Sequence, residues 1–280
     1  MSYKTILQKI KEKTGIEFKV FHSIEESENF NNSANSIVIN EDVIVHLTIL
    51  RHAQILKDFF DCFISIKSLS FFYLSLNFEI NSLKSFKNLT SLELSSDNLN
   101  IIPDFIGDLK NLTSLSISSN ALKELPGFIG DLKNLTSLSI SSNALEELPG
   151  FIGDLKNLTS LSISSNALEE LPDSIGDLEN LISLSIFSNT LKEIPNSIGN
   201  LKGLTSLNIS SKELKELPNL IGDLKNLTYL NIYSYELKEL PDSISDLKKL
   251  ALLNVMSNKL KKLPDSIGNL KHLTILNVFF

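Results

Sequence analysis

From Leu89 to His272 the chain repeats one unit of 23 residues eight times without a change of register. The units that begin at Leu112, Leu135 and Leu158 are almost copies of one another. A repeat of this length indicates a solenoid, a propeller or an array, in which each unit buries its apolar residues against its neighbours. The period therefore constrains the fold more than any other feature of the sequence.

Apolar residues recur at positions 1, 4, 6, 11, 14, 18 and 21 of the unit, counted from its first leucine. In one unit, Leu115 and Ile117 alternate with serines on either side, a pattern that is typical of a short strand. We expect the strands of successive units to pair in parallel, about 4.8 Å apart. The apolar positions should then form continuous buried columns through the stack.

The other regular positions predict how each unit turns back. Position 9 is asparagine in five units, and we expect this side chain to be buried and to bond backbone groups of the turn. All eight prolines stand at position 15, where a fixed φ ends the extended segment. Position 19 is glycine in seven units, as a tight bend would favour. The return segment has room for about two helical turns at most, so we expect a short helix or a 3-10 turn.

These residues resemble the leucine-rich repeat pattern LxxLxLxxNxLxxLPxxIGxLxx, in the 23-residue class of bacterial and Ras-group-like intracellular proteins. The resemblance covers residues 44–280, as about ten repeats and a final strand, and the two repeats before Leu89 are irregular. It implies an α/β fold. The expected architecture is a curved, horseshoe-shaped solenoid with a parallel β-sheet on its concave face and short helices or 3-10 turns on its convex face.

Residues 1–43 predict an N-terminal cap, because a stacked array otherwise exposes an apolar end. Apolar spacing over 3–13 predicts a helix that ends at Gly15. Residues 16–21 alternate as a strand, and the segments 37–39 and 43–49 predict a hairpin around 40–42. We therefore expect a cap over 1–43 and a solenoid over 44–280.

The net charge of −7 and the lack of a basic stripe argue against a nucleic-acid partner. Lysine and glutamate at positions 12, 13, 20 and 22 are mixed in sign, which we interpret as a solvated rim. No stretch of 18 uncharged apolar residues is present, so we expect no membrane span. Cys62 is the only cysteine and can form no intramolecular disulfide, which favours a reducing, cytoplasmic location. Export by a non-classical route stays open.

Catalysis finds little support in the sequence. The four histidines are scattered, and none stands with Cys62 at a spacing that indicates a nucleophile pair or a metal site. Cys62 lies in an apolar stretch, which favours a buried structural thiol. No phosphate-binding loop and no dinucleotide motif is found. We expect a non-enzymatic protein with no catalytic residue, no cofactor and no bound metal.

Positions 3, 5 and 7 of each strand should point outward, and in the three middle units all of them are serine. Serines offer hydroxyl groups but little area to bury against a partner. In the C-terminal half large apolar side chains and asparagines occupy these columns, and both are types that supply interface contacts. In two successive units the asparagine of position 9 is replaced, by Lys212 and by Tyr235. If that asparagine amide is buried, losing it would lower the free energy of unfolding by about 1–3 kcal/mol. The predicted partner-binding residues are Phe187, Asn208, Lys212, Tyr229, Asn231, Tyr233, Tyr235, Leu252, Asn254 and Met256.

The last residues, Val278, Phe279 and Phe280, follow a strand without a polar cap. Such an edge is expected either to pair with a second copy, as a homodimer, or to continue into a longer protein. The leading interpretation is a non-enzymatic protein–protein interaction module that binds a protein partner through the concave face of its C-terminal half. Two alternatives remain open: a surface, adhesive or glycan-binding structural protein that uses the serine- and threonine-rich face, and the targeting arm of a larger protein.

Overall fold

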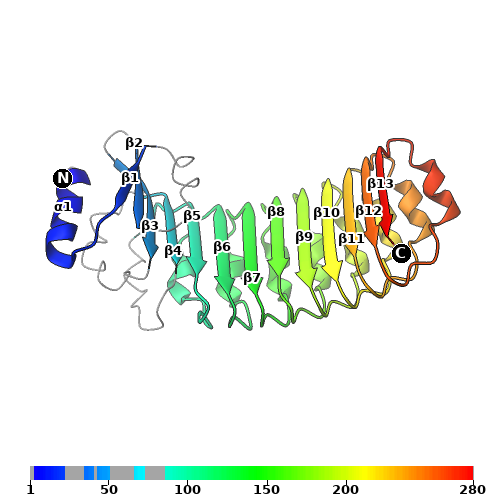
Figure 1. Ribbon diagram of the computed structural model, residues 1–280, viewed down its shortest axis with the longest axis horizontal. Helices are drawn as coiled ribbons and strands as arrows, with labels where there is room; N and C mark the ends of the chain where they lie inside the picture. Colours follow the sequence, from blue (N-terminus) through cyan, green and yellow to red (C-terminus); the bar gives the residue numbers. More distant parts are fainter. Residues whose placement is uncertain (1–2, 23–34, 41–42, 51–65, 73–85, 280) are drawn as a thin grey trace. The chain divides into compact units, whose positions relative to one another are not determined.

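The computed structural model describes residues 3–22, 35–40, 43–50, 66–72 and 86–279 (Figure 1). The molecule comprises two compact units, Met1–Asn120 and Ala121–Phe280. The irregular stretches 51–65 and 73–85, with Cys62 among them, lie outside the described residues. Residues 23–34 and 41–42 of the predicted cap lie outside them too.

The first unit begins with helix α1 (Tyr3–Thr14), which buries Ile6 and Ile10. Gly15 follows it with a φ of 74°, a left-handed conformation that glycine adopts without strain. The helix and its end were both expected from the sequence. The strand expected over 16–21 is shorter, since only β1 (Lys19–Phe21) is extended. Within the described ranges, no helix combines the length and apolar character needed to cross a bilayer.

A sheet follows α1 in the first unit. Strand β1 pairs in parallel with β2 (Ser36–Asn40), and β2 pairs in antiparallel fashion with β3 (Val43–Leu50), as the hairpin prediction requires. Parallel pairing then continues through β4 (Ser68–Phe72), β5 (Ser91–Ser95) and β6 (Ser114–Ser119). The 3-10 segment η3 (Asp104–Asp108) stands between β5 and β6. The domain boundary after residue 43 stays a prediction.

The second unit is a stack of parallel strands in sequence order, and paired residues lie one 23-residue repeat apart (Figure 1). Its strands are β7 (Ser137–Ser142), β8 (Ser160–Ser164), β9 (Ser183–Ser188), β10 (Ser206–Ser211), β11 (Tyr229–Tyr233), β12 (Leu252–Met256) and β13 (Ile275–Phe279). Each repeat returns through one 3-10 segment: η4 (Gly127–Asp131), η5 (Gly150–Asp154), η6 (Asp173–Asp177), η7 (Asn196–Asn200), η8 (Asn219–Asp223), η9 (Asp242–Asp246) and η10 (Asp265–Asn269). Parallel strands with short 3-10 returns confirm the architecture expected from the repeat.

The apolar positions form the buried columns that the repeat predicts. In the repeat that begins at Leu158, for example, Leu161 and Ile163 are at most 1% exposed. Close packing, and not a tight bend, explains the recurring glycine of position 19 at Gly153, Gly176, Gly199 and Gly222. A Cβ atom built on Gly153 would lie 2.7 Å from the carbonyl oxygen of Ser174 in the next repeat, and the φ of Gly153 is not positive. A side chain there would push adjacent repeats apart.

The prediction of a buried asparagine at position 9 is wrong. Asn143 and Asn166 are exposed, and Asn166 donates through Nδ2 to Oδ1 of Asn143 on the surface. The buried polar residue is the preceding serine, because inward alternation continues from positions 4 and 6 to position 8. Ser165 Oγ donates to the carbonyl oxygen of Leu145 at 2.6 Å and accepts from the amide of Ala167 at 3.2 Å. Buried serines occupy position 8 in all eight repeats: 96, 119, 142, 165, 188, 211, 234 and 257.

Candidate functional site

The strand face of the second unit is the outward surface made by positions 3, 5 and 7 of β7 to β13. Burial alternates along β11, where Tyr229, Asn231 and Tyr233 are partly exposed while the residues between them are buried. The predicted outward orientation is therefore confirmed. In β7 and β8 the same positions hold only serines, so this face changes character along the stack.

The outward residues of β11, β12 and β13 form three rows, which we call the C-terminal patch. One apolar row pairs Tyr229 with Leu252 and Leu252 with Ile275. The other pairs Tyr233 with Met256 and Met256 with Phe279. Met256 is 38% exposed, Ile275 45% and Phe279 56%. The row between them is asparagine, at 231, 254 and 277. The structure thus brings together six of the ten residues predicted for partner binding: Tyr229, Asn231, Tyr233, Leu252, Asn254 and Met256.

Two predicted residues lie towards the serine-faced strands. Phe187 on β9 pairs with Ser164 on one side and Ser210 on the other, so a serine-bearing strand separates it from Tyr233. It is 40% exposed and does not belong to the patch. Asn208 on β10 pairs with Asn231 and accepts a hydrogen bond from its Nδ2 at 2.6 Å. Asn208 therefore continues the asparagine row by one strand.

Lys212 and Tyr235 are exposed residues that follow strands β10 and β11. The expected cost of losing a buried asparagine at these two positions is wrong, because position 9 is not buried. Ser211 and Ser234, at the buried position, still donate to the carbonyl oxygens of Leu191 and Leu214 at 2.6 Å. Substitution at position 9 therefore leaves these buried hydrogen bonds intact, so the fold does not require asparagine there.

Tyr235 instead supports its neighbour in the patch. The Tyr233 hydroxyl donates to the Tyr235 hydroxyl at 2.7 Å, and the two rings meet edge to face with centroids 5.3 Å apart. Donating this hydrogen bond stabilises the neutral phenol and raises the pKa of Tyr233 above its ordinary value of 10.0. Each ring restricts the other, so Tyr233 presents a partly ordered aromatic surface.

A hollow of about 220 Å³ lies in the patch, over β11, β12 and β13. The asparagine row and the row of Tyr233, Met256 and Phe279 line it, together with Ile232 and Val255. Of the described residues that line the hollow, none carries a charge at neutral pH. It therefore suits an uncharged group with apolar parts.

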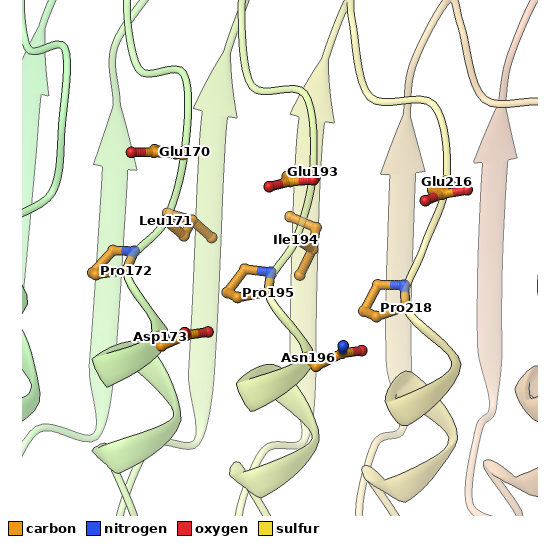
Figure 2. A pocket seen from close by; sticks show the side chains of 10 residues that line it. All are labelled: Glu170, Leu171, Pro172, Asp173, Glu193, Ile194, Pro195, Asn196, Glu216 and Pro218. Carbon is orange, nitrogen blue, oxygen red and sulfur yellow. The ribbon is translucent and has the colours of Figure 1, made fainter.

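A second, larger groove of about 680 Å³ lies beside the prolines that precede the 3-10 segments (Figure 2). Glu170, Glu193 and Glu216 stand in a row, one repeat apart, above Pro172, Pro195 and Pro218. None of these three glutamates has an ion pair within the described part of the chain. The sequence was expected to form a rim that mixes positive and negative side chains, and this uniform row of glutamates was not predicted. Position 13 is glutamate in six successive repeats: 124, 147, 170, 193, 216 and 239. Comparing repeats position by position would have found it.

In the ranges that the structure describes, no group of three or more histidine, cysteine, aspartate or glutamate residues is arranged to hold a metal ion. Lysines of neighbouring repeats pair with some carboxylates on the surface, as Lys192 does with Glu169 at 2.7 Å. Such exposed pairs contribute little to stability.

Strand β13 pairs with β12, and among the described residues no strand pairs with its other side. Val278 is partly exposed there and Phe279 is exposed, whereas Phe280 lies outside the described residues. The homodimer expected through this edge stays a prediction.

Comparison with solved structures shows the fold. A crystal structure of a TDR receptor is 24% identical, with 93% of this chain and 46% of that chain covered and a TM-score of 0.66. The Arabidopsis receptor kinase HAESA is 21% identical, with 99% of this chain and 53% of that chain covered and a TM-score of 0.62. An internalin, inlF, from Listeria monocytogenes is 17% identical, with 99% of this chain and 88% of that chain covered and a TM-score of 0.57. The chain spans about half the length of the two receptors.

Family profiles agree with the repeat. A profile described as a leucine-rich repeat region matches residues 137–213 and 204–280, and one described as leucine-rich repeats in two copies matches residues 110–152. No curated protein matches the sequence significantly. The region profile covers more than half of the chain, and the fold is a solenoid of parallel strands. The chain therefore belongs to the leucine-rich repeat family.

Proposed function

We propose that this protein is a non-enzymatic interaction module that binds a protein partner through the C-terminal patch. One observation carries the proposal: large apolar side chains stand at outward positions on three neighbouring strands. Met256, Ile275 and Phe279 are each more than a third exposed at neighbouring positions of β12 and β13. A contiguous exposed apolar surface of this kind is typical of binding sites. The side of the solenoid that carries it is the side expected to be concave.

The residue types favour a protein as the partner. Tyrosine and methionine are enriched in the buried cores of protein–protein interfaces, and asparagine adapts its hydrogen bonding to a partner. The contact between Tyr233 and Tyr235 reduces the freedom that Tyr233 would lose on binding, which lowers the entropic cost of association. The serines of β7 and β8 offer neither apolar area nor an ordered aromatic surface.

The comparisons support the proposal at the level of the fold. HAESA is a receptor kinase that was solved in complex with the peptide hormone IDA and the co-receptor SERK1. A solenoid that presents one long sheet surface is suited to such binding. Fold alone does not establish function, and the side chains of the C-terminal patch are what favour binding in this chain.

Replacing Tyr229 and Tyr233 together by alanine tests the proposal. The matched control replaces Ser160 and Ser164 by alanine, since these residues occupy the same two columns on β8. The full chain, immobilised, is used to capture partners from a lysate of the cells that make it. We expect the tyrosine variant to lose capture of the partner and the serine variant to retain it, with unchanged circular dichroism in both.

Unaltered capture by the tyrosine variant would contradict the proposal. The glycan-binding alternative makes a different prediction, which a glycan array checks. Binding to an oligosaccharide that is lost when Ser139 and Ser162 are replaced by bulky residues would favour the serine face and a structural or adhesive role.

A further inference from the structure

The asparagine row of the C-terminal patch is interrupted in its middle. Asn231 Nδ2 donates to Oδ1 of Asn208 at 2.6 Å, and Asn277 Nδ2 donates to Oδ1 of Asn254 at 2.7 Å. Asn231 and Asn254 are paired in register on β11 and β12, yet among the described residues their side chains share no hydrogen bond. The gap therefore leaves an acceptor, Asn231 Oδ1, next to a donor, Asn254 Nδ2.

These two atoms complement the edge of an extended peptide. In a strand, the N–H and C=O of one residue point to the same edge, and strands exchange both bonds through such a pair. Asn231 and Asn254 stand side by side on adjacent strands, so this acceptor and this donor both face the N–H and C=O of one extended residue laid across them. A backbone residue above the gap could donate its N–H to Asn231 and accept from Asn254.

The flanking rows fit the side chains of the same peptide. When an extended chain points its edge at a surface, successive side chains project to opposite sides. A peptide that crosses the strands along the asparagine row would place alternate side chains on the row of Tyr229 and Leu252 and on the row of Tyr233 and Met256. The hollow on the second side, of about 220 Å³, leaves room for an apolar side chain.

The lining also decides against charged and sugar ligands. Because no described residue of the hollow is charged, a carboxylate, phosphate or ammonium group would be desolvated without a partner. A sugar could meet the two asparagines through a hydroxyl group. Its remaining hydroxyl groups would then face Val255, Met256 and Phe279 in the hollow, which bury favourably only against apolar atoms.

We propose that the gap between Asn231 and Asn254 recognises the backbone of an extended, apolar peptide segment of the partner, with one residue bonded to both asparagines and its neighbours on the two apolar rows. The inference rests on the proposed function of the C-terminal patch and adds the kind of segment that it binds. The hollow of the patch shares no lining residue with the larger groove beside Glu170, Glu193 and Glu216.

A library of phage-displayed linear dodecapeptides, selected on the full chain and counter-selected on the Tyr229→Ala, Tyr233→Ala variant, supplies the probe. We expect the selected peptides to share alternating apolar residues. Calorimetry then compares Asn254→Asp, which replaces the donor by a carboxylate, with Asn258→Asp, which adds the same charge at an exposed position of the same repeat. Affinity should fall about tenfold or more for Asn254→Asp and change less than about twofold for Asn258→Asp.

A second measurement leaves the protein unaltered. Each backbone amide of the selected peptide is replaced in turn by an ester, which removes one N–H. One position should weaken binding to the wild-type chain by about fivefold or more, and this penalty should disappear on Asn231→Ala. The pair of measurements separates a lost hydrogen bond from a misfolded variant.

The outcomes distinguish this inference from the proposed function. Peptides that depend on Tyr229 and Tyr233, but bind Asn254→Asp unchanged and tolerate every ester, would overturn the inference and leave the proposed function in place. Peptides that are enriched only when the counter-selection is left out, and that bind the tyrosine variant as tightly as the wild type, would overturn both. Enrichment of no peptide, or binding of an oligosaccharide that Asn254→Asp abolishes, would also overturn the inference.

Discussion

The repeats that carry β7 and β8 and those that carry β11 and β12 have the same interior and different outward faces. Leu161 on β8 and Leu230 on β11 occupy one buried column and are 1% and 0% exposed. Outside, the first pair of strands shows serines and the second shows tyrosines, asparagines, leucine and methionine. The inward positions determine the fold, and the outward positions are free to acquire a binding surface without altering it.

The largest effect that tests this comparison is the loss of a buried serine. Ser165→Ala leaves the carbonyl oxygen of Leu145 and the amide of Ala167 without their partner, which should lower the free energy of unfolding by about 1–3 kcal/mol. Ser234→Ala in the patch repeat should cost a similar amount, because it removes the equivalent bond to Leu214. Urea-induced unfolding followed by circular dichroism measures both.

The control for these variants is Asn166→Ala, at the exposed position of the same repeat. Asn166→Ala should change the free energy of unfolding by no more than about 0.5 kcal/mol, as is usual for surface substitutions. If Asn166→Ala were as damaging as Ser165→Ala, the asparagine would be a structural residue after all. A cost for Ser165→Ala that is absent for Ser234→Ala would show that the two interiors differ.

A smaller effect distinguishes the patch from the serine-faced strands. Tyr235→Phe removes the acceptor of the Tyr233 hydrogen bond, so the pKa of Tyr233 should fall towards its ordinary value of 10.0. The sign follows because donation stabilises the neutral phenol, and its loss makes deprotonation easier. A pH titration of the labelled tyrosine ring carbons by NMR reports this pKa. As the control, Tyr229→Phe removes a hydroxyl group elsewhere in the patch and should leave the pKa of Tyr233 unchanged. A pKa of Tyr233 that does not respond to Tyr235→Phe would refute the contact between the two hydroxyl groups.

Much of the fold could be predicted because the repeat itself carries the register. Strands, 3-10 returns and buried columns follow from positions that recur every 23 residues. The buried serine was not predicted because the asparagine of position 9 was expected to be the buried polar residue. Following the alternation of inward and outward residues along the strand gives position 8. Alternation from Leu161 and Ile163 leads to Ser165 and not to Asn166.

The candidate site was predictable only in part. Reading outward positions found the six residues that the patch unites, but sequence alone could not show that Ser210 separates Phe187 from Tyr233. The edge-to-face contact of Tyr233 with Tyr235 depends on how the chain turns after β11. The break in the asparagine row is a matter of side-chain geometry, since the same residue type stands at 208, 231, 254 and 277.

Hydroxyl-radical footprinting of the full chain, with and without its captured protein partner, tests the central claim most directly. Met256 and Tyr233 report on the patch, and the partly exposed Phe151 in η5 reports on the opposite side of the repeats. We predict that the partner protects Met256 and Tyr233 from oxidation and leaves Phe151 unchanged. Protection of Phe151 with no change at Met256 and Tyr233 would contradict a binding site on the C-terminal patch.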